Sequence, residues 1–199
     1  MLNNELNRRN FVAAGLALAV LPKSAFAQTE ASAKALVNSV VNDINRVIAS
    51  GKSENAMLRD FEKIFVQYAD VPIMARYALG ADARTATPSQ LKQFTKAFQG
   101  YISRKYGRRF REFIGGKVNV RNARKIKAGY EVRTIVKLRG SAPFDVTFLV
   151  SDKSGREKFY NMFIEGVNLL LTERTEIGAM LDARKGNLDQ LIKDLNKTG

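Results

Sequence analysis

The sequence predicts an α+β domain, with helices at both ends of the chain and an antiparallel sheet between them. Hydrophobic residues recur every three to four positions from residue 30 to residue 113 and again beyond residue 171, which predicts amphipathic helices. Between residues 130 and 164 they alternate with polar residues, which predicts strands. Turn sequences such as Ser151–Gly155 separate these strands, which favours hairpins over crossover connections. We therefore expect a small twisted antiparallel sheet of about four strands, with helices packed on one face.

Three helices are predicted in the first part of this domain. The first runs from Glu30 to Ala49, where an apolar stripe ends just before a glycine. The second begins after Ser53, which is expected to be its N-cap. Val71–Pro72 is expected to break the chain, and a short helix from Met74 to Leu79 then ends at Gly80.

A fourth helix has the clearest start signal in the chain. Thr87 is expected to cap it, Pro88 suits the first helical position, and Gln90 completes a capping box. Its apolar stripe continues towards Phe113, and Gly115–Gly116 is expected to end it.

The alternating segments predict three strands and a shorter fourth one. They cover residues 130–138, 144–150 and 158–164, and Lys117–Val120 is the short strand. Two helices are expected after the sheet. One runs from about residue 171 to residue 185, and the last is capped by Asn187.

Composition excludes several kinds of active site. The chain has 199 residues, 45% of them hydrophobic and 26% charged, as in a single globular domain. It contains no Cys, His or Trp, which excludes disulfides, thiolate nucleophiles, His-based triads and Cys/His metal clusters. Ser50–Ser53 ends like a phosphate-binding loop, but Arg46 stands where that loop needs glycine, so a helix stop followed by a cap is the better interpretation. The acidic residues near the C-terminus are interpreted as solvated surface groups: Glu165, Glu173, Glu176 and Asp182. We predict no enzymatic activity and no metal site.

The first 27 residues have the order of an export signal. Arg8–Arg9 is followed by an apolar run from Phe11 to Leu21 and by Ala25–Phe26–Ala27, a small-x-small cleavage pattern. An amphipathic first helix is the alternative, but it does not account for these three features in this order. The sequence therefore predicts a cleaved twin-arginine signal over residues 1–27, a single domain over residues 28–199, and a periplasmic location.

The chain is strongly basic. Its 33 Lys and Arg residues oppose 19 Asp and Glu residues, for a formal net charge of +14, which predicts an anionic partner. Many of the basic residues lie between Arg104 and Lys127, interleaved with aromatic residues that would also suit single-stranded nucleic acid. The expected export argues against nucleic acid and favours anionic lipid, with a merely solvated face as the alternative. Four residues are candidates for surface or headgroup docking: Arg104, Arg108, Arg109 and Arg111.

Two blocks of the sequence resemble the MlaC family of periplasmic phospholipid-binding proteins, also called toluene-tolerance auxiliary transport proteins. The first block is Ala78–Leu79–Gly80 and Arg84–Gln90, followed by the aromatic residues Phe94, Phe98, Tyr101 and Tyr106. The second is Tyr160–Asn168, followed at similar spacing by Gly178, Leu181, Gly186, Leu188, Leu191 and Leu195. The sequence departs from the family pattern where Asn161 replaces an aspartate, Asn168 replaces a serine, and Glu157 or Lys158 stands in place of a tryptophan.

The resemblance implies a lipid carrier without a cofactor. Such a carrier moves phospholipid between an outer-membrane lipoprotein complex and an inner-membrane ABC transporter with a periplasmic substrate-binding ring. A carrier of another lipid, such as a hopanoid, and an adaptor without internal ligand are the alternatives. In this interpretation the sheet and helices enclose an apolar lipid pocket, although any single lining candidate could equally be plain core. The candidates are Val71, Met74, Leu79, Phe94, Phe98, Tyr101, Tyr106, Phe110, Val132, Val136, Val146, Phe148, Tyr160, Met162, Ile164 and Val167.

Overall fold

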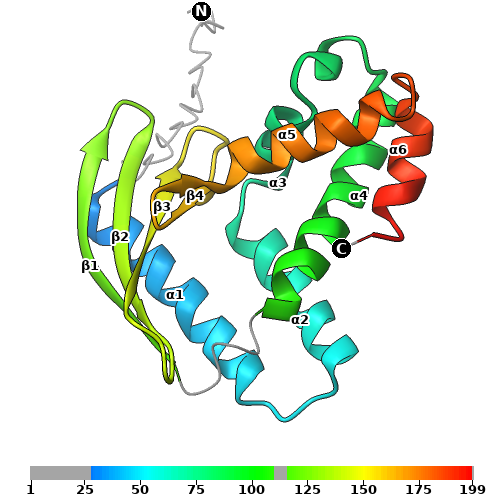
Figure 1. Cartoon of the computed structure of the whole chain (residues 1–199). Helices are drawn as coiled ribbons and strands as arrows, with labels where there is room; N and C mark the ends of the chain where they lie inside the picture. The colour runs from blue at the N-terminus through cyan, green and yellow to red at the C-terminus, as the bar shows by residue number, and fades with distance from the viewer. Residues whose placement is uncertain (1–27, 110–115, 199) are drawn as a thin grey trace, which may run out of the picture.

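The computed structural model describes residues 28–109 and 116–198, and it has the predicted α+β architecture (Figure 1). The expected signal at residues 1–27 lies outside the described residues, and the fourth helix ends at Gly107, earlier than the end expected after Phe113. The helices are α1 (Glu30–Ile48), α2 (Glu54–Tyr68), α3 (Val71–Leu79), the 3-10 helix η1 (Gly80–Arg84), α4 (Pro88–Gly107), α5 (Leu169–Asp182) and α6 (Leu188–Leu195). The strands are β1 (Lys117–Ile126), β2 (Gly129–Lys137), β3 (Phe144–Ser151), β4 (Lys158–Ile164) and β5 (Val167–Asn168).

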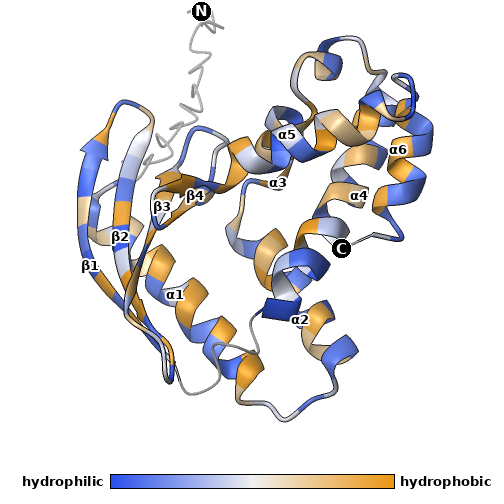
Figure 2. Cartoon of the chain, viewed as in Figure 1, coloured by the Kyte–Doolittle hydropathy of each residue, from blue (hydrophilic) through white to orange (hydrophobic). Residues whose placement is uncertain are grey.

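A curved sheet and a cluster of helices form the two sides of the molecule (Figure 1). The strands follow the order β1-β2-β3-β4-β5, and all neighbours are antiparallel. Helix α1 packs against β1, β2 and β3, whereas α3, α4, α5 and α6 pack mainly on one another. Helix α2 contacts both α1 and α4, so it links the two sides. Helix α1 and the strands carry hydrophobic positions along their length (Figure 2), and the buried ones belong to one hydrophobic core.

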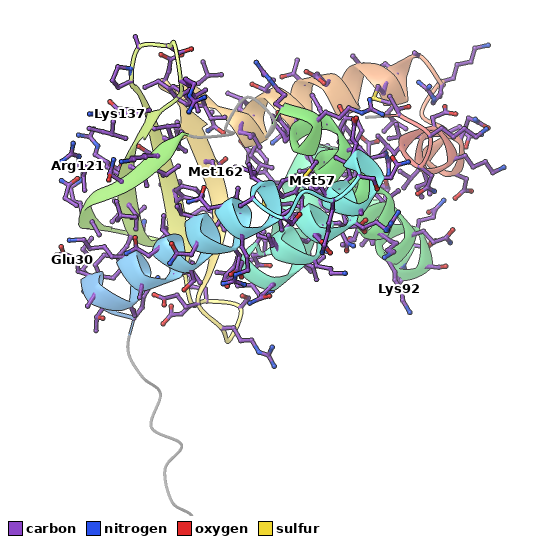
Figure 3. All side chains as sticks on the ribbon, turned by 90° about the horizontal axis from the view of Figure 1, so that it is seen from below. Glu30, Met57, Lys92, Arg121, Lys137 and Met162 are labelled. Carbon is purple, nitrogen blue, oxygen red and sulfur yellow. The ribbon has the colours of Figure 1, made fainter. Side chains whose placement is uncertain are left out.

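The first strand is longer than expected, and a β-bulge explains why it was underestimated. Val120 pairs with Thr134, but Ala123 pairs with Val132, so β1 carries one extra residue between them. The bulge keeps Val120 and Ala123 packed against the core although an extra residue interrupts their alternation. The polar side chains of this segment, including Arg121 and Lys137 of β1 and β2, lie at the sheet end of the molecule (Figure 3).

A second bulge, in β4, explains why the face predicted for Tyr160 was wrong. Strict alternation predicts Tyr160 on the same face as Met162. Leu149 pairs with Asn161, however, and the next pair is Val150 with Phe159, so Tyr160 is the extra residue. Phe159 therefore takes the inner face, where it is buried and its ring meets that of Phe148 edge to face at 5.6 Å.

The predicted capping box of α4 is confirmed. The Gln90 backbone N–H donates to the Thr87 hydroxyl, and the Gln90 side chain accepts from the Thr87 N–H. Two helix starts were predicted too late. Helix α3 begins at Val71 because Asp70 caps it and Pro72 fits its first turn, and α5 begins at Leu169 because the residue before it is its cap.

The edge of the sheet is joined to the helices at two places. At the start of β4, the Asp70 N–H donates to the Phe159 carbonyl at 2.8 Å, and Lys158 donates to carbonyls at the end of α2. Further along β4, the Asn161 amide donates to the Asn168 Oδ1 at 3.0 Å and accepts from the backbone N–H at the start of α5. The two asparagines that depart from the family pattern thus bond to each other.

The tight β1–β2 turn generates a stability prediction. Gly129 has φ +143°, and a Cβ added there would lie 2.1 Å from the Val150 carbonyl oxygen. We expect Gly129→Ala to lower the free energy of unfolding by about 3 kcal/mol, because both the backbone conformation and the contact resist a side chain. Gly178→Ala, in α5 with open space around its Cβ position, should instead stabilise by about 0.5–1 kcal/mol. Urea denaturation of both variants tests this, and equal stabilities would contradict it.

Candidate functional site

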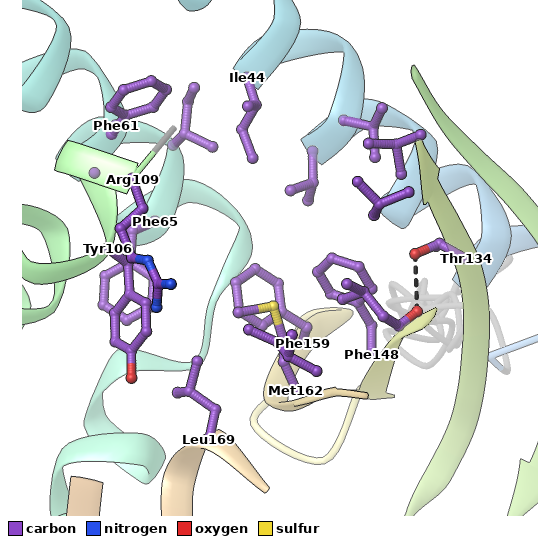
Figure 4. A pocket seen from close by; sticks show the side chains of 18 of the residues that line it. Ile44, Phe61, Phe65, Tyr106, Arg109, Thr134, Phe148, Phe159, Met162 and Leu169 are labelled. Carbon is purple, nitrogen blue, oxygen red and sulfur yellow. Dashed lines mark hydrogen bonds between the residues drawn. The ribbon is translucent and has the colours of Figure 1, made fainter. Parts of the chain in front are cut away.

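An apolar cavity of about 370 Å³ lies between the inner face of the sheet and helices α1, α2 and α4. Its volume falls in the range of ligand-binding pockets. Figure 4 shows side chains from both layers pointing into this space. The sheet contributes Val118, Val136, Phe144, Val146, Phe148, Phe159, Met162 and Ile164. The helices contribute Val40, Val41, Ile44, Phe61, Ile64, Phe65, Met74, Ile102, Tyr106 and Leu169.

Two hydroxyl groups of the wall are hydrogen-bonded to backbone carbonyls. The Thr134 hydroxyl donates to the Val146 carbonyl at 2.8 Å, as Figure 4 shows, and the Ser103 hydroxyl donates to a carbonyl of its own helix. Among the described lining residues, only Arg109 and Glu165 carry charge. Such a wall offers water few hydrogen bonds and suits a hydrocarbon ligand.

The structure brings some of the predicted lipid-binding residues to this cavity and places others elsewhere. Those at the wall are Met74, Tyr106, Val136, Val146, Phe148, Met162 and Ile164. Those outside the lining are Val71, Leu79, Phe94, Phe98, Tyr101, Val132, Tyr160 and Val167, and Phe110 lies outside the described residues. Phe94 and Phe98 are fully buried and stack on each other at 6.1 Å, as core residues do.

Sequence reasoning missed the contribution of α1 and α2 to the wall. Val40 and Ile44 of α1, and Phe61 and Phe65 of α2, line the cavity. Each pair belongs to an apolar stripe with helical spacing that the sequence displays clearly. The stripe predicts which helix face is buried, but it carries no signal that separates a core contact from a cavity wall.

Behind Tyr106 lies a buried polar cluster that joins α4 to α5. The Lys105 ammonium donates to Glu173 Oε1 at 2.8 Å and to Glu176 Oε2 at 2.5 Å. The Tyr106 hydroxyl donates to the same Glu173 oxygen at 2.5 Å, and the Tyr101 hydroxyl donates to Glu176 at 3.1 Å. The interpretation of Glu173 as a surface acid was wrong, because its side chain is 0% exposed.

The surroundings raise the pKa values of Lys105, Tyr101 and Tyr106. Burial alone would lower the pKa of Lys105, but its hydrogen bonds to Glu173 and Glu176 outweigh burial and raise it. Burial, followed by the charge of Glu173, raises the pKa of Tyr101 to about 12. Burial and the hydrogen bond to Glu173 also raise the pKa of Tyr106. Both phenols therefore remain protonated donors, and Tyr106 is held in the cavity wall.

The basic docking candidates separate into different environments. Arg104 donates to the carbonyls of Leu195 and Thr198, so it fastens the end of the chain to α4. Arg109 lines the cavity, and Arg108 is exposed beside it. Arg111 lies outside the described residues.

The profile of the MlaC protein family matches residues 34–197. The chain belongs to the MlaC family. A phospholipid-binding protein from Ralstonia solanacearum, whose structure contains a phospholipid, has the same fold with a TM-score of 0.70 and 22% sequence identity. The match covers 83% of this MlaC-family chain and 95% of that protein. Across residues 28–109 and 116–198, helices of a length and hydropathy suited to spanning a bilayer are absent.

The Lys105–Glu173 pair generates a second stability prediction. We expect Lys105→Met to lower the free energy of unfolding by about 3 kcal/mol or more, because it leaves a buried carboxylate without its cation. The double variant Lys105→Met/Glu173→Leu should regain most of that loss, since no buried charge remains. Lys34→Met, which breaks an ion pair on the surface of α1, should change stability by less than about 0.5 kcal/mol. Chemical denaturation distinguishes these outcomes, and a Lys105→Met variant as stable as Lys34→Met would contradict the prediction.

Proposed function

We propose that this protein is a carrier that encloses the acyl chains of a phospholipid in the cavity. The apolar wall of the cavity is the observation that carries the proposal. Without an occupant, the hydrocarbon side chains of this wall either lack contacts or face water, and both are unfavourable. This cost favours an apolar occupant. The phospholipid found in the Ralstonia protein of the same fold supports an acyl chain as that occupant.

Enclosure is what transport through water requires. A two-chain phospholipid has roughly 30 methylenes, and exposing each costs about 0.8 kcal/mol, so free passage would cost on the order of 20 kcal/mol. We propose that the carrier works in the periplasm after removal of residues 1–27. Its proposed partners are an outer-membrane lipoprotein complex and an inner-membrane ABC transporter, as the family resemblance implies. The hydrocarbon wall supports binding of cargo rather than catalysis on it.

One charged residue of the cavity lining, Arg109, gives the proposed site a polar end. Arg109 lines the cavity and Arg108 is exposed next to it, so both are proposed contacts for a lipid phosphate. Arg104 is engaged with carbonyls of the C-terminal segment.

Native mass spectrometry of the purified mature protein tests the proposal directly. We expect about one lipid per chain, because the apolar residues line a single continuous cavity. Organic extraction should then yield a glycerophospholipid, whereas a hopanoid would assign a different cargo to the same cavity. A protein that remains empty after mild purification would contradict a carrier and favour an adaptor.

Substitutions of two phenylalanines distinguish a residue of the cavity wall from a residue of the hydrophobic core. We expect Phe148→Glu to remain folded but to lose its lipid, because the carboxylate enters a space that water can fill once the lipid is absent. Phe98→Glu should unfold the protein, since its side chain is 0% exposed and a charge there would be buried without a partner. Thr147→Glu, on the outer face of the same strand as Phe148, is the control and should keep both fold and lipid. Lipid content and thermal unfolding are measured together. A folded Phe148→Glu variant with a full complement of lipid would contradict the assignment.

A further inference from the structure

Exposed apolar side chains gather at one place on the helical side of the molecule. Among the residues that the structure describes, the large hydrophobic side chains with high exposure are Val66, Ile73, Tyr77, Val167 and Leu171. Four of these five belong to α3 or to the β5–α5 segment, and α3 and α5 pack directly against each other. Scattered exposed apolar residues are ordinary, but a cluster of them marks an interaction surface.

The geometry makes these side chains one continuous surface. Ile73 and Tyr77 lie one turn apart on α3 and are 45% and 40% exposed. The Arg174 guanidinium of α5 lies over the Tyr77 ring, 5.3 Å from its centroid, which joins the two helices at the surface. Leu171, 51% exposed, lies one turn before Arg174 on α5, and Val167, in β5 two residues before the start of that helix, is 61% exposed. We call this surface the α3–α5 face; it comprises Ile73, Arg76, Tyr77, Val167, Leu171 and Arg174.

The two charged residues of this face are arginines, and the exposed Glu165 lies two residues before Val167. Arg76 and Arg174 are both exposed, and α3 contains no acidic residue. Within α5, the carboxylates of its first turns point to α4 instead, because Glu173 is buried and Glu176 binds Lys105 and Tyr101. Aliphatic tips, a tyrosine and arginines together are the composition of protein segments that lie at a membrane–water interface.

We propose that the α3–α5 face docks the protein on an anionic lipid bilayer. Ile73, Tyr77, Val167 and Leu171 enter the headgroup region, and the two arginines contact lipid phosphates. The face is separate from the cavity lining, so docking does not depend on what the cavity holds. Leu169, two residues before Leu171, lines the cavity, so a docked bilayer would lie close to one of its walls.

Vesicle binding by the full mature chain tests the docking. We expect the wild-type protein to co-sediment with vesicles of phosphatidylcholine and phosphatidylglycerol in equal amounts, and to bind pure phosphatidylcholine vesicles weakly. Ile73→Ser/Leu171→Ser should weaken binding to the anionic vesicles by about tenfold, because it removes the inserted apolar area. The matched control Ile135→Ser/Leu149→Ser, with partly exposed apolar residues on the outer sheet face, should bind like wild type.

Charge variants locate the electrostatic part of the binding. Arg76→Gln/Arg174→Gln should weaken binding at low salt, and the difference from wild type should shrink at high salt, where charges are screened. Arg121→Gln/Arg139→Gln, which removes two exposed charges from the sheet side, should have a smaller effect. If this sheet variant loses as much binding as the α3–α5 variant, or if wild-type protein ignores anionic vesicles, the proposal is overturned. The proposal is also overturned if two copies of the chain associate through this face in solution and anionic vesicles do not compete with that association.

A fluorescent reporter tests insertion itself. The chain contains no Trp, so Tyr77→Trp introduces a single indole on the α3–α5 face. Its emission should shift to shorter wavelength with anionic vesicles and be quenched by brominated acyl chains, whereas Lys92→Trp on the exposed side of α4 should show neither effect. Phe148→Glu, expected to empty the cavity, should still bind vesicles like wild type. This variant separates a failure of docking from a failure of the proposed carrier function.

Discussion

The structure depends on keeping the helical layer apart from the inner face of the sheet while joining the two at their edges. Hydrophobic surfaces that face each other across a cavity of about 370 Å³ would gain free energy by closing on each other. Specific contacts must therefore hold the two layers apart. The Asp70–Phe159 backbone bond and the Asn161–Asn168 bond fix β4, near the edge of the sheet, to the starts of α3 and α5. Because these contacts are directional hydrogen bonds, they set a geometry that non-directional apolar packing alone would not set.

The buried Glu173 has a similar structural consequence on the helical side. A buried ion pair rarely stabilises a fold more than apolar residues of the same volume, so stability is a poor explanation for it. Its consequence is to position the Tyr106 ring. Glu173 accepts hydrogen bonds from both Lys105 and Tyr106, and the ring of Tyr106 forms part of the cavity wall. An apolar pair at the same seam would pack α4 on α5 without determining where this ring points.

Periodicity predicted the elements of this fold well, because each has a buried stripe that is visible in the sequence. The start of α4 at Thr87 was predictable for a local reason, since capping chemistry involves neighbouring residues only. The bulge at Tyr160 was not predictable, because it depends on how β4 pairs with β3 and not on β4 itself. The buried state of Glu173 was hidden for the same reason. Its partner Lys105 is 68 residues away in the chain.

Helix α4 shows why the cavity wall could not be separated from the core by sequence. Phe94 and Phe98 pack in the core of the helical cluster, whereas Ile102 and Tyr106, one and two turns further on, line the cavity. All four side chains are largely apolar, little exposed and spaced as on one helix face. The hydrophobic pattern of α4 is therefore the same in the core as at the cavity. The difference arises from what lies opposite each residue. The first two pack in the hydrophobic core, and the last two face the cavity. A single helix can therefore contribute rigidity through one end and a binding wall through the other, and tolerance to polar substitution should change along its length.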